Sequence, residues 1–176
     1  MKYLATLFSL SLCPFLSGCW YAAAFIDQDR TQERPNEQDL IGKWIPTKES
    51  LKDMRDRGHY PVAKHEVELR SDRTFTMMNM PDWWMNPWGE SRKGLDSGSG
   101  VWKLTEEEGI RSIWACLRKE PECKGPLWSL RLKFNNEKSF RSVDLARQKA
   151  PYLMVFTFGD PDDAYATRFE RMGTPN

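Results

Sequence analysis

Histidine and cysteine are scarce in this chain of 176 residues, which holds two of the first and four of the second. The histidines, His59 and His65, do not show the spacing of metal ligands. The chain also lacks the motifs of zinc proteases, of serine hydrolases with a nucleophile elbow, and of phosphate-binding loops. We therefore expect no catalytic residue, no metal site and no cofactor, and we interpret the protein as not an enzyme.

A net charge is also nearly absent, since the formal charge at pH 7 is +1. Removal of residues 1–18 would take away Lys2 and no acid, leaving 25 residues of each sign. A neutral protein has no electrostatic basis for binding nucleic acid or an anionic membrane surface. We expect no nucleic-acid partner.

The apolar run at residues 3–15 is too short to span a bilayer as a stable anchor. It follows Lys2, as in the leader of an exported protein. The next four residues, LSGC at 16–19, resemble the lipobox of bacterial lipoproteins. In that family small residues precede a cysteine whose thiol receives the lipid. The alternative is an ordinary secretory leader with an incidental cysteine.

The resemblance implies a signal peptide over residues 1–18 and lipidation of Cys19. Fatty acyl chains such as palmitate would then hold the protein at a membrane, because each buried CH₂ contributes ~0.8 kcal/mol. Aspartate after the cysteine is the inner-membrane retention signal of enteric bacteria, and Trp20 stands there instead. We expect a lipid-anchored envelope protein, at the outer membrane and facing the periplasm.

The mature chain divides into a tether and one domain. Residues 20–38 begin apolar and become polar and charged, without a periodic apolar pattern from Asp27 onward. We interpret residues 19–38 as the lipidated N-terminus and a flexible tether, with an r.m.s. reach of ~25 Å. Residues 39–176 form the domain. The whole chain is 40% hydrophobic and 12% aromatic, enough to build a core.

Short strands with turns between them fill this domain. The clearest alternation lies at residues 126–134, where Trp128, Leu130, Leu132 and Phe134 share one face. A short helix is expected at 48–57, capped by Thr47 or Ser50. Residues 106–109 are expected to form a turn, and residues 135–151 have no assignment. The expected strands are 39–46, 65–70, 74–78, 100–104, 110–117, 126–134, 152–158 and 165–172.

About eight strands and one short helix predict an all-β fold. Neighbours in sequence should be neighbours in space, so the simplest arrangement is a small antiparallel up-and-down barrel, which has no open edge. A two-sheet sandwich is the alternative.

Several motifs are similar to those of lipocalin-like (calycin-type) β-barrels. Gly42-Lys43-Trp44 resembles their G-x-W motif, Gly-Val-Trp recurs at 100–102, and the hairpin SDRTF at 71–75 is similar to a turn of bacterial lipocalin-like lipoproteins. The tract at 80–104 and the closing residues 159–171 look like an uncharacterised family of such lipoproteins. The resemblance implies a barrel with Trp44 at one end, and it implies no activity.

A tryptophan-rich tract is the most unusual local feature. Trp83, Trp84, Met85 and Trp88 lie between turn-forming residues, which predicts a loop. Such a loop could form an apolar contact surface for a ligand or partner. It could equally fold over one end of the barrel and belong to the core.

Two further groups have simple interpretations. Cys116 and Cys123 are expected to form a disulfide, since an even pair in an exported protein usually does, at a gain of roughly 2–3 kcal/mol. A redox-active pair is the alternative, although the spacing is not C-x-x-C. The acidic residues at 160–163 could bind calcium but fit a solvated turn better.

Two functions remain open at this point. The first is a non-catalytic binding domain for a small apolar ligand, held inside the barrel with the tryptophan tract at its mouth. The second is a protein-binding lipoprotein with a filled barrel, such as an inhibitor, an immunity factor or an envelope-assembly factor. An eight-stranded barrel is only just wide enough for side chains to fill it. Its expected inward residues are large: Trp102, Trp128, Phe134, Phe156 and Phe169.

Overall fold

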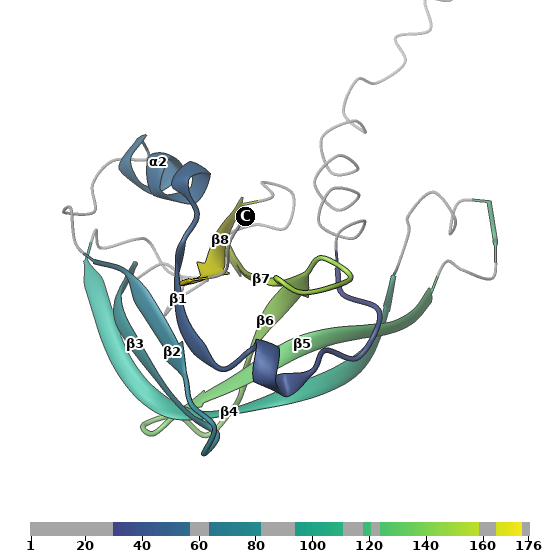
Figure 1. Cartoon of the computed structure of the whole chain (residues 1–176), viewed down its shortest axis with the longest axis horizontal. Helices are drawn as coiled ribbons and strands as arrows, with labels where there is room; N and C mark the ends of the chain where they lie inside the picture. Colours follow the sequence, from purple (N-terminus) through teal and green to yellow (C-terminus); the bar gives the residue numbers. More distant parts are fainter. Residues whose placement is uncertain are drawn as a thin grey trace, which may run out of the picture.

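Eight strands form one closed antiparallel barrel in the computed structural model of the chain (Figure 1). The structure describes residues 30–56, 64–81, 94–110, 118–120, 124–158 and 165–173. Each strand pairs with its neighbours in sequence, and β8 closes the barrel against β1. The predicted up-and-down barrel is therefore confirmed, and the sandwich alternative is wrong. The strands are β1 (Gly42–Pro46), β2 (Glu66–Leu69), β3 (Thr74–Pro81), β4 (Leu95–Ile110), β5 (Lys124–Phe134), β6 (Arg141–Ala146), β7 (Leu153–Phe158) and β8 (Tyr165–Arg171).

One short α-helix, α2 (Lys48–Asp56), follows β1 at the predicted place. The backbone N–H of Ser50 donates to the Thr47 hydroxyl, so Thr47 caps the helix as expected. The Ser50 hydroxyl in turn accepts from the backbone N–H of Arg168 at 2.8 Å. This bond fastens the first turn of α2 to β8.

Two strand predictions differ from the structure. β4 does not stop before the expected turn at 106–109 but continues to Ile110, because Glu106–Gly109 pairs with the β5 residues from Trp128 back to Gly125. Ile110, expected to begin a separate strand at 110–117, is instead the last residue of β4, and residues 111–117 lie outside the described part of the chain. The last residues of β4 show no clear apolar–polar alternation in the sequence. They belong to a long two-stranded ribbon formed by β4 and β5 (Figure 1). β6 lies in the segment left unassigned, where only Val143 and Leu145 provide the alternating apolar signal.

Residues before the predicted domain boundary at residue 39 are already joined to the barrel. The backbone N–H of Thr31 donates to Leu145 O at 2.8 Å, and Thr31 O accepts from the backbone N–H of Trp128 at 2.9 Å. Thr31 therefore bridges β5 and β6, and it is fully buried. Residues 30–38, expected to be part of the flexible tether, are thus joined to the barrel by backbone bonds that leave no periodic pattern in the sequence.

A 3-10 helix, η2 (Glu37–Asp39), leads this segment into β1. Leu40 follows and is fully buried, and its carbonyl accepts from the indole Nε1 of Trp44 at 2.9 Å. The second Gly-x-Trp behaves similarly, because Trp102 Nε1 donates to Arg70 O at 3.0 Å. Both tryptophans are buried with their one polar atom satisfied.

Candidate functional site

Most predicted site residues lie outside the described part of the chain. This holds for the lipidation residue, the two expected disulfide partners, the four residues of the tryptophan tract and the acidic turn at 160–163. Their roles remain predictions from the sequence. The residues concerned are Cys19, Cys116, Cys123, Trp83, Trp84, Met85 and Trp88.

The barrel interior is filled by large side chains. Four of the five expected inward residues, Trp102, Phe134, Phe156 and Phe169, are at most 2% exposed. The fifth, Trp128, is half-buried near the end of the barrel, with the Arg34 guanidinium 5.5 Å from its ring centre. A side chain lining a cavity wide enough for water would keep accessible surface toward it. The described core residues keep almost none.

Aromatic contacts occupy the middle of this interior. The rings of Phe75 and Phe134 meet edge to face with centres 5.1 Å apart, and those of Phe156 and Phe169 do so at 5.0 Å. Side chains from β1 to β8 complete one continuous cluster. Such packing resembles the interior of an ordinary protein core.

One end of the barrel is closed by the segment before β1. Arg73, in the β2–β3 turn, forms an ion pair with Glu37 of η2. The guanidinium of Arg73 also lies 4.6 Å from the ring centre of Trp102.

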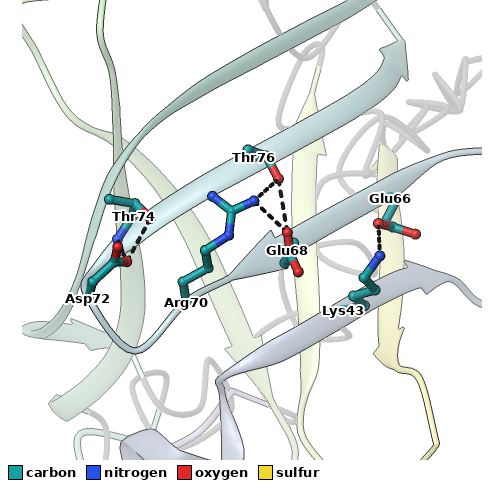
Figure 2. Close-up of polar contacts among 7 residues, drawn as sticks. All are labelled: Lys43, Glu66, Glu68, Arg70, Asp72, Thr74 and Thr76. Atoms are coloured by element: carbon teal, nitrogen blue, oxygen red, sulfur yellow. Dashed lines mark hydrogen bonds and ion pairs between the residues drawn. The ribbon is translucent and has the colours of Figure 1, made fainter.

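The outer face of β1, β2 and β3 carries a polar ladder (Figure 2). Lys43 Nζ lies 3.0 Å from one oxygen of Glu66, and Lys64 Nζ lies 2.6 Å from the other. Farther along, Arg70 donates to Glu68 at 2.6 Å. Each cation named here has an acidic partner within the same face.

Glu66 is the most buried acid of this ladder, with about one-twentieth of its surface exposed. Hydrogen bonds from Lys64 and then Lys43 hold the pKa of Glu66 below its ordinary value, against the opposing effect of burial. The same contact with Glu66 raises the pKa of Lys43. A carboxyl whose pKa is lowered by folding stabilises the protein when ionised, and this stabilisation is lost as the pH falls through the folded pKa.

Replacing Glu66 by Gln is therefore expected to make the free energy of unfolding depend less on pH in the acid range. The parent protein should lose stability from about pH 4.5 downward, where the unfolded carboxyl begins to hold its proton. At neutral pH, E66Q should be less stable than the parent protein. On acidification, its free energy of unfolding should fall by less than that of the parent. Urea unfolding at a series of pH values measures this, with E49Q on the exposed face of α2 as the control. Parallel curves for E66Q and the parent would contradict the interpretation.

A different surface lies on the outer side of β4 and β5. Val101 and Lys103 point outward from β4, next to Lys133 on β5, and Phe140 stands in the turn before β6. Val101 is 43% exposed and Phe140 is 37% exposed. The ammonium groups of Lys103 and Lys133 lie 4.5 Å and 5.9 Å from the Phe140 ring centre. We call these four residues the cationic face.

Two acidic residues farther along the same side of the barrel already have partners. Glu107 accepts from Arg131 at 2.6 Å and from the Ser129 hydroxyl at 3.0 Å. Asp144 pairs with Arg30 at 2.8 Å, and burial raises the pKa of Asp144 despite that neighbour. Neither carboxylate pairs with the lysines of the cationic face.

The sequence indicated only part of this surface. Alternation in the expected strands 100–104 and 126–134 places Val101, Lys103 and Lys133 on the faces opposite the core. Phe140 lies in a segment without an assignment, so nothing indicated that its ring would meet two lysines. The pairing of β4 with β5, a long-range contact, brings the four side chains together.

The described residues contain neither a group of side chains suited to a metal ion nor a helix suited to crossing a membrane. No three His, Cys, Asp or Glu side chains there are grouped so as to hold a metal ion. His65 is buried, and its ring Nδ1 bonds to Asn79 O. Within the same ranges, no helix has the length and apolar character needed to cross a membrane.

Comparison with protein-family models, with curated proteins and with solved structures finds no match to this chain.

Proposed function

We propose that this protein is a lipid-anchored bacterial envelope protein whose barrel binds another protein, and that it is neither an enzyme nor a carrier of apolar ligands. The observation that carries the proposal is the filled interior. Trp44, Phe75 and Phe169 are fully buried in one cluster that occupies the place where a carrier would hold its ligand. In this proposal the partner protein binds to the outer surface of the barrel.

The anchor in this proposal is the lipid expected on Cys19. Because Arg30 pairs with Ala146 at the end of β6, ten residues, 20–29, separate Cys19 from the first residue joined to the barrel, a path of eleven Cα–Cα steps. Such a length spans at most about 40 Å when fully extended. The partner would therefore lie at the membrane, or no farther from it than the length of the tether plus the width of the barrel.

Native mass spectrometry of the protein purified gently from its own envelope tests the proposal. We expect a chain that begins at Cys19 and carries covalent acyl groups, with no small adduct that leaves on denaturation. C19A should lack the acyl mass and should no longer fractionate with membranes. A stoichiometric apolar adduct that survives gentle extraction would support a carrier and contradict the protein-binding proposal.

A further inference from the structure

The cationic face combines exposed apolar surface with positive charge on a rigid wall. Val101 is directly paired with Lys133 across β4 and β5, and Lys103 is two residues farther along β4. These strands share the longest ladder of the barrel. The side chains are therefore held in place by the sheet, which lowers the entropic cost of binding a partner.

The charges of this face are not neutralised within the described chain. Lys103 and Lys133 have the Phe140 ring as their neighbour and no carboxylate within ion-pair distance among the described residues. A cation over an exposed ring is held only weakly. The polar ladder differs, because there Lys43 and Arg70 already have Glu66 and Glu68 (Figure 2).

We infer that the cationic face docks an acidic segment of a partner protein. Carboxylates of that segment pair with Lys103 and Lys133, and an apolar side chain of the segment packs on Val101 and Phe140. Aromatic side chains such as Phe are enriched at protein interfaces. This inference rests on the proposed function and adds the surface and the chemistry of the partner.

An anionic membrane is the other surface that attracts lysines. Membrane recognition of this kind uses clusters of about four to eight basic residues. The cationic face offers two unpaired lysines, and the mature chain expected from the sequence is neutral. The observations therefore favour an acidic protein segment over anionic lipid.

A titration followed by NMR tests the inference on the whole mature chain. The probe is a short synthetic peptide with glutamates around a central Leu-Phe pair. We expect amide shifts to cluster around Val101, Lys103, Lys133 and Phe140, and the affinity to weaken as salt is added. Two control peptides replace either the glutamates by lysines or the Leu-Phe pair by serines, and both should bind more weakly.

Charge reversal gives the decisive comparison. The double variant K103E/K133E should lose at least about tenfold in affinity for the peptide, whereas K48E/K52E on α2 makes the same change of net charge and should bind normally. Both should remain folded at the temperature of the titration, since the lysines are on the surface and lose only exposed contacts, with Phe140 in one variant and with Asp56 in the other. Equal binding by the two double variants, or shifts located on another face, would overturn the inference.

Two further experiments distinguish a failure of this inference from a failure of the proposed function. Binding to phosphatidylglycerol vesicles, lost in K103E/K133E while the peptide fails to bind, would replace the protein partner by lipid. Photo-crosslinking in the envelope from position 76, on the polar ladder, but not from position 101 would overturn the inference and leave a protein-binding function intact. A small apolar adduct in native mass spectrometry would instead remove both.

Discussion

Replacing Phe134 by Ala is expected to lower the free energy of unfolding by about 3–5 kcal/mol. The Phe134 ring is 2% exposed, meets Phe75 edge to face, and packs over Gly98 of β4. Its removal would leave a cavity in a filled core, and the surrounding strands cannot collapse into it without breaking the β4–β5 ladder. Chemical denaturation of F134A and the parent gives the difference.

F140A is the matched control, because the same side chain is removed from the surface. Phe140 is 37% exposed and has two lysines as cation–π neighbours. Contacts of that kind contribute about 0.5–1 kcal/mol at exposed sites. With two such contacts, we therefore expect F140A to lose about 1–2 kcal/mol, well below the loss in F134A. If F134A were as stable as F140A, the interior would have to be loosely packed, as in a ligand chamber.

Replacing Gly100 by Ala should have an effect of similar size through the backbone. A Cβ at this position would lie 2.0 Å from the carbonyl oxygen of Lys133 and 2.9 Å from the Cα of Phe134. Neither atom belongs to a flexible side-chain end, so β4 and β5 would have to separate. We expect a loss of about 3 kcal/mol, at the upper end of the usual cost of overpacking.

G109A tests this explanation on the same pair of strands. The atom nearest to a Cβ at Gly109 is Leu127 Cδ1, at 2.5 Å, which belongs to the end of a side chain and not to the backbone. We expect G109A to lose less than half as much stability as G100A, measured in the same denaturant series. Equal losses would mean that glycine is required for strand flexibility at both places and not for close approach at Gly100.

The close approach at Gly100 also explains one of the two Gly-x-Trp motifs. Gly42 has a φ of +133°, a conformation that side chains rarely adopt, and it lies against the Arg171 side chain. Gly100 has its neighbour strand too near for any side chain. The same three-residue pattern therefore arises from two different constraints, which the sequence could not distinguish.

The barrel itself was predictable because most strands alternate cleanly. Leu130, Leu132 and Phe134 are buried, whereas Arg131 and Lys133 point outward, as the pattern indicates. The attachment of the segment from Arg30 to Glu37 to the barrel was not predictable. Thr31 is held by backbone bonds to β5 and β6, and backbone bonds do not depend on a pattern of apolar side chains.

The candidate site was harder to predict from the sequence than the fold. Size alone suggested a filled core, since Phe156 and Phe169 are large, and their burial agrees with that suggestion. The cationic face depends on which residues of β4 and β5 lie opposite each other. That register is a relation between two strands, and the spacing within either strand alone does not give it.

Xenon binding is the most direct test of the claim that the barrel is filled. Xenon enters dry apolar cavities of proteins without needing polar partners. We predict that the parent protein takes up no xenon among the core residues, by diffraction from pressurised crystals or by xenon NMR, and that F134A gains a site beside Phe75. Xenon in the core of the parent protein would reveal an open chamber, and the protein would then have to be considered a ligand carrier.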